Sequence, residues 1–343
     1  MKNMLLLLAF MFISIALQAA EFPYARVKTP DDKWHYIDKS GKIAVNTEFN
    51  YIYPFSEGVA AVKVEKRGKI GFIDKTGKMI IEPQFDSTRE FSEGLCSVRL
   101  GKLYGFIDKK GNMVIKPQFT WANSFTEGMA PFSIKEKDKV TNGYINKEGE
   151  KVITGNYHGI MPFYEGLACV GKKDKNGKAF RGFIDKNGKV IIELRYYSAG
   201  QFCDGLSVVR FTKKDKEYSY INKKGEKVIS VKCKYSFGFS EGLARVKTEK
   251  GYGYIDKNGN MVIAENFKRV NDFSEGLAAV LLKGKWGYID KSGNIVIPAK
   301  FKKASNFHHG LAVVRIDKLY GFIDKTGKTV IEPVYKSCYS FSQ

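Results

Sequence analysis

One phrase of sixteen residues recurs along most of the chain. It reads YGFIDKKGNMVIKPQF from Tyr104, WGYIDKSGNIVIPAKF from Trp286 and YGFIDKTGKTVIEPVY from Tyr320. Its second residue marks nine units, 34 to 39 residues apart, at His35, Gly71, Gly105, Gly143, Gly182, Ser219, Gly253, Gly287 and Gly321. A period of this length indicates a repeat architecture, because one such unit is too small to bury its own apolar face. We therefore expect one cooperative array rather than nine separate domains.

Each unit contains three short apolar runs that predict three β-strands. They have the forms GLAAVLL, YGFID and MVI, and Asp-Lys-x-Gly or Asn-Lys-x-Gly lies between the second and the third. Asp at the first turn position accepts hydrogen bonds from the backbone ahead of it, and Gly supplies the positive φ that closes a turn. No helical periodicity appears after the first twenty residues. The sequence therefore predicts an all-β array of nine three-stranded antiparallel repeats of roughly 34 residues.

The two ends of the chain suggest how the array finishes. It stops at Phe341-Ser342-Gln343, where other units continue into Glu-Gly-Leu-Ala, and Ala25 to Thr29 (ARVKT) repeats the strand at Ala244 to Thr248. Two half-units can combine into one composite unit and close a propeller-like ring. The alternative is an open or superhelical β-solenoid that begins and ends within a unit.

A second recurring phrase, FSEGLA, precedes the first strand of each unit. Its Phe predicts a core anchor, and its Glu-Gly predicts a turn. The acidic residues form a row: Glu57, Glu93, Glu127, Glu165, Asp204, Glu241 and Glu275. A structural or solvated role is the expectation for this row, and binding of cations or of a basic partner is the alternative.

With WG at Trp286-Gly287 and YG at Tyr104, Tyr252 and Tyr320, the unit resembles the WG-containing repeat family of bacteria. The resemblance covers about Lys33 to Ser342, and His35, Ser219 and His308-His309 depart from the pattern. It implies a β-repeat scaffold that serves as an interaction module. It supplies no shared catalytic residues.

The N-terminus predicts export. Lys2 precedes an uncharged apolar run, Met4 to Leu17, and small residues follow at Ala19-Ala20. This layout is typical of a secretory signal peptide, and the run is short for a membrane span. We predict a signal peptide at residues 1–20, a single repeat domain at residues 21–343, and a periplasmic, extracellular or outer-surface location in a bacterium. An uncleaved anchor is the alternative.

The formal net charge of +21 favours anionic partners, such as an anionic component of the cell envelope. Solvated lysines at hairpin tips would give the same composition. Polar insertions lengthen three successive units, in the stretches KEKDKVTN, KKDKNGKAF and TKKDKE. Insertions confined to one seam of a repeat are expected on one edge of the array. Nucleic acid is an improbable partner for an exported protein.

Catalytic motifs are missing from the sequence. It contains no P-loop, H-E-x-x-H or C-x-x-C, and no G-x-S-x-G nucleophile elbow, since GFSEG at Gly238 to Gly242 is a copy of the FSEG phrase. The turn Asp residues lack the spacing of a calcium loop. We expect no enzyme activity, no cofactor and no metal site. The five cysteines occupy unrelated repeat positions, and Cys96 and Cys169 are expected to be buried thiols.

A few residues break the repeat and are therefore candidates for function. His308-His309 replaces Ser-Glu and could contribute to a metal site only if both lie in a turn. Non-repeating aromatic residues are candidates for exposed contacts: Trp121, Tyr51, Tyr53 and Tyr197. No specific binding residue is assigned by the pattern.

Three functions remain open from the sequence. The first is an exported, non-catalytic scaffold that binds a protein or an anionic envelope component through a basic surface. The second is an envelope enzyme, for example one acting on a polysaccharide, with its site in loops at one end of the ring. The third is a structural spacer. An enzyme would need one unit with a cluster of unique polar residues, and the sequence shows few of these.

Overall fold

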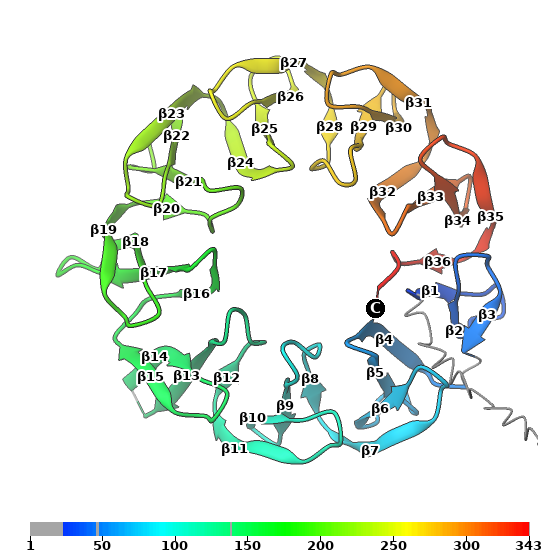
Figure 1. Cartoon of the computed structure of the whole chain (residues 1–343), viewed down its shortest axis with the longest axis horizontal. Helices are drawn as coiled ribbons and strands as arrows, with labels where there is room; N and C mark the ends of the chain where they lie inside the picture. Colours follow the sequence, from blue (N-terminus) through cyan, green and yellow to red (C-terminus); the bar gives the residue numbers. More distant parts are fainter. Residues whose placement is uncertain (1–22, 46–47, 138, 343) are drawn as a thin grey trace, which may run out of the picture.

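The chain forms a β-propeller of nine blades around a central axis (Figure 1). The computed structural model describes residues 23–45, 48–137 and 139–342, so the predicted signal peptide lies outside the described residues. Every regular element within these ranges is a β-strand. The predicted all-β ring is confirmed, and the open solenoid is excluded.

Each blade is one antiparallel sheet of four strands that follow one another from the axis outward. In this order, blade 1 consists of β36 (Ser337–Cys338), β1 (Ala25–Lys28), β2 (Trp34–Ile37) and β3 (Ile43–Val45). Blade 2 consists of β4 (Tyr51–Ser56), β5 (Val59–Lys63), β6 (Ile70–Asp74) and β7 (Met79–Phe85). Blade 3 consists of β8 (Ser87–Thr88), β9 (Cys96–Leu100), β10 (Leu103–Ile107) and β11 (Met113–Phe119). Blade 4 consists of β12 (Trp121–Ala122), β13 (Ala130–Glu136), β14 (Lys139–Ile145) and β15 (Lys151–Gly155). Blade 5 consists of β16 (Ile160–Tyr164), β17 (Leu167–Lys173), β18 (Ala179–Ile184) and β19 (Val190–Tyr196). Blade 6 consists of β20 (Ser198–Ala199), β21 (Ser207–Arg210), β22 (Glu217–Ile221) and β23 (Lys227–Lys232). Blade 7 consists of β24 (Tyr235–Ser240), β25 (Leu243–Lys247), β26 (Tyr252–Ile255) and β27 (Met261–Phe267). Blade 8 consists of β28 (Arg269–Val270), β29 (Ala278–Leu282), β30 (Lys285–Ile289) and β31 (Ile295–Phe301). Blade 9 consists of β32 (Lys303–His308), β33 (Leu311–Ile316), β34 (Leu319–Asp324) and β35 (Thr329–Tyr335).

The fourth strand of each blade is the difference from the predicted three. It is the strand nearest the axis. In β4, β16, β24 and β32 it includes the anchor Phe of the FSEGLA phrase, and in the other five blades it has only two residues and ends before that Phe, as in β8 and β12. Two residues give no alternating pattern, so the sequence could not reveal the strand in these five blades.

Strands from the two ends of the chain close the ring. In blade 1, β36 near the C-terminus pairs with β1, where Val27 faces Cys338, and Tyr24 forms a bridge with Ser342. Ala25 and Val27 are fully buried, and the Arg26 guanidinium donates a hydrogen bond of 2.7 Å to the carbonyl of Ile52 in blade 2. The composite unit predicted from the ARVKT segment therefore exists.

The core lies between blades rather than within them. One cluster combines Tyr254 and Ile263 of blade 7 with Val280 and Ile289 of blade 8. Five tyrosines extend this contact, because each donates its hydroxyl to a backbone carbonyl of the next blade at 2.6 to 2.8 Å: Tyr36, Tyr144, Tyr220, Tyr254 and Tyr288. Each unit thus buries its neighbour, as expected for a repeat protein.

The Gly of the YG phrase permits a bulge in the outer strand. In blade 3, a Cβ on Gly105 would lie 2.4 Å from the carbonyl oxygen of Ile115 and 2.8 Å from the nitrogen of Pro117. The register between β10 and β11 shifts at this point. Ser219 occupies the same position in blade 6, where it pairs with Ser230 without a shift. Blade 6 accommodates Ser219 in place of Gly because its strands pair here in a regular ladder rather than through a bulge.

The predicted hairpin turns are present in every blade. At Asp38, Oδ1 accepts hydrogen bonds from the backbone of Ser40 and Lys42, and Gly41 has a φ of +85°. The same turn contacts the neighbouring blade, since a Cβ on Gly41 would lie 3.3 Å from Ile331. The turn carboxylate is used by its own backbone.

In the described ranges there is no helix with the length and apolar composition that a membrane span requires.

Candidate binding surfaces

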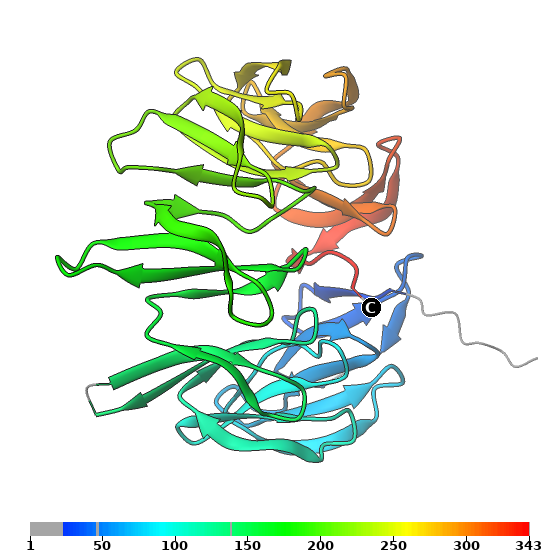
Figure 2. The same cartoon turned by 60° about the vertical axis from the view of Figure 1, so that its left-hand side comes forward.

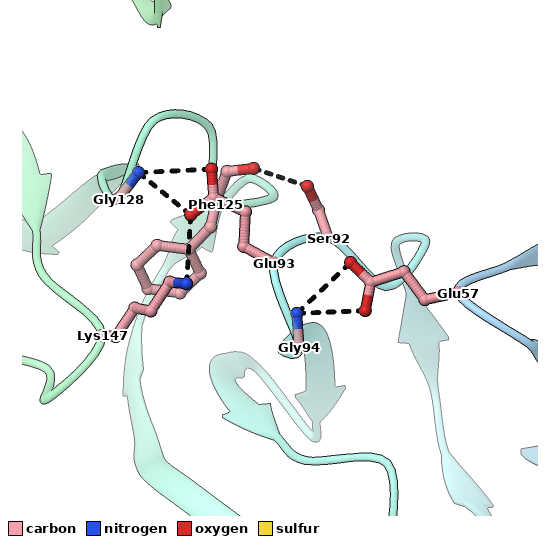
Figure 3. Close-up of polar contacts among 7 residues, drawn as sticks. All are labelled: Glu57, Ser92, Glu93, Gly94, Phe125, Gly128 and Lys147. Atoms are coloured by element: carbon pink, nitrogen blue, oxygen red, sulfur yellow. Dashed lines mark hydrogen bonds and ion pairs between the residues drawn. The ribbon is translucent and has the colours of Figure 1, made fainter.

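A row of carboxylates links the blades at one end of the ring. Each lies in the turn between the innermost strand and the next, in the left-handed conformation, as for Glu93 with a φ of +55°. The Glu93 carboxylate accepts the backbone N–H of Gly128 in the following blade at 3.0 and 3.2 Å (Figure 3). Nearby, the hydroxyl of Ser92 donates to the carbonyl of Phe125 at 2.7 Å. We name the seven acidic residues of this row the carboxylate belt: Glu57, Glu93, Glu127, Glu165, Asp204, Glu241 and Glu275.

The lysine of the next blade's hairpin turn completes each link. Lys147 lies 3.3 Å from Glu93 (Figure 3), and Lys109 lies 3.1 Å from Glu57. Six belt residues have such a lysine, and Asp204 is the exception, since its shorter side chain makes no ion pair among the described residues. The geometry places the acidic row in contacts between blades, as the structural interpretation of the sequence expected.

The belt gives the protein a dependence on pH. Burial raises the pKa of Glu275, but hydrogen bonds from Lys325 and from the backbone of Gly310 outweigh burial and hold the pKa below its ordinary value. A lowered pKa in the folded state means that the stabilisation is present above the unfolded pKa and is lost as pH falls through the folded pKa. We expect Glu275→Gln to lower the free energy of unfolding by about 1 kcal/mol at pH 7 and by almost nothing at pH 3. Urea unfolding of both proteins at the two pH values measures this.

Glu82→Gln is the matched control for this prediction. Glu82 is exposed on β7, and no side-chain hydrogen bond or ion pair of Glu82 is present within the described ranges. It should show little change at either pH. A Glu275→Gln difference that persists undiminished at pH 3 would contradict a charge-dependent link.

The belt is interrupted where blade 9 meets blade 1. His309 takes the place of the acidic residue and keeps the left-handed conformation, with a φ of +55°. The Tyr24–Ser342 bridge corresponds to the Leu95–Ser92 bridge of blade 3, so Pro23 stands where other blades have the Gly that donates its N–H. Proline has no N–H, and a carboxylate at position 309 would lack its backbone donor. This accounts for the departure of His309 from the repeat.

The histidine pair does lie at a turn, but it has no third ligand. Among the residues described, no group of three His, Cys, Asp or Glu side chains is close enough together to hold a metal ion. His308 is exposed and lines a cavity near the axis.

The aromatic candidates lie in or near the innermost segments. Tyr51 and Tyr53 contact each other on β4 with ring centroids 4.9 Å apart, and Trp121 belongs to β12. Tyr197 lies beneath the Arg210 guanidinium at 5.8 Å. The structure does not bring these four side chains together in one site.

The polar insertions lengthen hairpins on the opposite end of the ring from the belt. In an antiparallel four-stranded blade, the turn between the second and third strands points away from the other two turns. The hairpins β13–β14 and β17–β18 extend beyond the rest of the ring (Figure 2). With the β21–β22 loop they form what we name the basic hairpin surface: residues 135–137, 139, 172–178 and 210–217. These residues include eleven Lys and Arg against four Asp and Glu.

Its loops are held in shape by their own polar groups. Arg210 donates to the carbonyls of Lys213 and Asp215 at 2.7 and 2.8 Å. The Asp215 carboxylate accepts from the backbone and hydroxyl of Thr212, and these bonds lower its pKa. Asp174 in the neighbouring hairpin accepts from the backbone of Asn176 and Lys178. The carboxylates of Asp174 and Asp215 are thus occupied within their own loops, and Glu217 lies 3.8 Å from Lys227.

The lysines of the two ends of the ring therefore differ. Six turn lysines are neutralised by the belt, whereas Lys173, Lys175, Lys213 and Lys214 make no ion pair within the described ranges. The insertions concentrate unpaired positive charge on three adjacent blades, 4 to 6.

The cysteines show the burial expected of small apolar side chains. Cys96 and Cys169 are 0% and 1% exposed, and burial raises the pKa of their thiols to about 12 and about 11. Such thiols are inert at neutral pH.

Comparison with known proteins gives both a fold and a family. No curated protein matches the sequence. Among solved structures, Kluyveromyces lactis Hsv2 with loop 6CD replaced by a Gly-Ser linker is 11% identical, with a TM-score of 0.43 over 69% of this chain and 92% of that chain. Porphyromonas gingivalis dipeptidyl peptidase 4 is 9% identical, with a TM-score of 0.51 over 82% of this chain and 59% of that chain, a likeness of fold alone.

The family model described as WG containing repeat matches nine segments that together cover nearly all of the described chain. The segments are residues 36–67, 70–104, 104–137, 143–175, 182–214, 218–251, 252–286, 286–320 and 320–343. They coincide with the nine repeats that form the ring. The chain belongs to the WG-containing repeat family.

Proposed function

We propose that this propeller is an exported, non-catalytic scaffold that binds an anionic component of the cell envelope through the basic hairpin surface. The observation that supports it most is the concentration of unpaired lysines on the hairpins of blades 4 to 6. The turn lysines at the other end of the ring are, by contrast, paired with the belt. A rigid ring holds these hairpins in fixed relative positions.

Electrostatics explains why an anionic partner fits. Clustered positive charge attracts polyanions and anionic head groups, and each lysine near an anionic surface contributes about 1 kcal/mol. The turns at Asp174 and Arg210 reduce the conformational freedom that binding would otherwise cost. Export is supported by the N-terminal apolar run of the sequence.

Vesicle binding with a charge-reversal variant tests this proposal. Lys173, Lys175, Lys213 and Lys214 are all replaced by Glu, and binding to vesicles with and without phosphatidylglycerol is measured over a salt series. We expect the unmodified protein to bind only the anionic vesicles and to be released by salt. The variant should bind at least about tenfold more weakly.

The matched control reverses four other hairpin lysines of the same end of the ring. Lys66, Lys102, Lys283 and Lys318 are exposed and belong to blades 2, 3, 8 and 9. Their replacement by Glu changes the net charge equally but leaves the basic hairpin surface intact. Equal losses in both variants would show attraction by net charge alone, and absence of binding by the unmodified protein at low salt would refute an anionic partner.

A further inference from the structure

A small polar cavity lies beside the axis, far from the basic hairpin surface. It has a volume of about 320 Å³. The inner segments of blades 8, 9 and 1 line it with Asn271, Asp272, Asn306, His308 and Ser340, and blade 7 contributes Arg245. These inner segments lie nearest the centre of the ring (Figure 1).

The residues involved occupy repeat positions that the fold leaves free to vary. They are the two residues before the anchor Phe, which read Tyr53-Pro54, Met161-Pro162 and Phe237-Gly238 in blades 2, 5 and 7. The pair is polar in blades 3 and 4, as Arg89-Glu90 and Asn123-Ser124, and it is Asn271-Asp272 and Ser305-Asn306 at the cavity. The fold uses their backbone, since Tyr254 and Tyr288 donate to the carbonyls of Asn271 and Ser305, and it also uses the Ser305 hydroxyl, which accepts the N–H of Val313. These contacts leave the side chains of Asn271 and Asn306 unexplained.

The charges of the cavity are balanced before any ligand binds. Arg245 lies 2.6 Å from Asp272, and its guanidinium stacks on Phe237 at 4.0 Å. A compensated pair favours neither an anion nor a cation, but it still presents donors and acceptors to a neutral molecule.

The side-chain amide of Asn306, a residue that lines the cavity, is not fully used by the fold. Its oxygen is buried and accepts no hydrogen bond within the described structure. A buried acceptor without a donor is unfavourable, and rotation of the amide toward the cavity would offer this oxygen to a ligand hydroxyl.

The cavity also coincides with the interruption of the repeat. In other blades, the Ser before the acidic residue donates to the next blade, as Ser274 donates to the carbonyl of Phe307 at 2.7 Å. His308 replaces this Ser and instead lies exposed at the cavity. The side chain at this repeat position joins two blades elsewhere, whereas His308 faces the cavity.

We infer that this cavity binds a neutral, polyhydroxylated ligand, namely a saccharide unit. Amide, imidazole and hydroxyl groups supply both donors and acceptors, which match hydroxyls that themselves donate and accept. The balanced charge selects against ionic ligands, and the volume lies at the small end of ligand sites in proteins. The inference is independent of the basic hairpin surface.

Calorimetry and saturation-transfer NMR with neutral methyl glycosides test it. Methyl glycosides of glucose, galactose, mannose and N-acetylglucosamine, and oligosaccharides of the same sugars, are titrated against the mature chain. At least one should bind saturably, and Asn306→Ala and His308→Ser should each weaken it at least about tenfold, or 1.4 kcal/mol. Tighter binding of oligosaccharides than of the glycosides would indicate a glycan as the source, and equal binding a free sugar.

Two features keep the test decisive. His308→Ser restores the residue of other units, so it should fold with an unchanged melting temperature. Asn123→Ala alters the repeat position of Asn271 on blade 4, outside the cavity, and should bind normally. The inference is wrong if no neutral sugar binds, if both cavity variants bind like the parent, or if only charged ligands bind.

Discussion

Deleting the chain up to Thr29 is expected to lower the melting temperature by roughly 10 °C or more. The deletion removes β1, which pairs with both β2 and β36 and is the strand that joins the two ends of the chain. Val27 and Ala25 are fully buried, and Arg26 holds the neighbouring blade through Ile52. Their loss leaves blade 1 without a continuous sheet and exposes the side of blade 9. Differential scanning calorimetry measures the effect.

A point variant separates ring closure from simple truncation. Val27→Asp places a charge in the same buried strand and should give a comparable loss, because a buried unpaired carboxylate is costly. Lys33→Ala, on the exposed turn of the same hairpin, should melt like the parent. An unchanged melting temperature after deletion would mean that β1 does not close a stable ring.

Gly105→Ala is expected to destabilise the protein by about 3 kcal/mol or more. Its new Cβ would meet the Ile115 carbonyl at 2.4 Å and the Pro117 nitrogen at 2.8 Å, and both belong to backbone rather than to a movable side chain. Relief requires that β10 and β11 separate at the bulge. Chemical unfolding of the variant, followed by circular dichroism, gives the loss.

Ser219→Ala tests the same repeat position in a blade that already accepts a Cβ. Ser219 is buried and pairs regularly with Ser230, so removal of its hydroxyl should cost no more than about 1 kcal/mol. Similar losses in the two variants would show that the bulge does not set the requirement for glycine.

The hairpins and the closure of the ring could be predicted because each has a local chemical requirement. Asp38 with Gly41 specifies a turn whatever surrounds it, and the ARVKT segment repeats a strand found elsewhere in the chain. The innermost strands could not be predicted. Strands such as β8 owe their conformation to pairing with a neighbour rather than to their own two residues.

The candidate sites were only partly accessible from the sequence. The row of acidic residues was visible, but its partners were not, since Gly128 and Lys147 belong to the next blade. The axial cavity could not be predicted, because Asn271 and Asn306 have no distinctive sequence context. The two residues before each anchor Phe vary among the nine units, but Asn123-Ser124 of blade 4 is polar as well, so this variation alone does not mark the cavity.

The carboxylate belt gives the ring a direction and leaves blade 1 outside its row. Every belt residue joins its blade to the following one, and the seven links run from blade 2 to blade 9. The chain passes directly from β35 of blade 9 to β36 of blade 1, so the ring opens where β36 separates from β1. Local opening follows the least stable contact, and this pairing of two residues is where the ring would first separate. Ser340 of the cavity follows β36 in the chain, so a ligand held there would restrain this segment and slow the opening. Ligand supply would then set the lifetime of the folded ring.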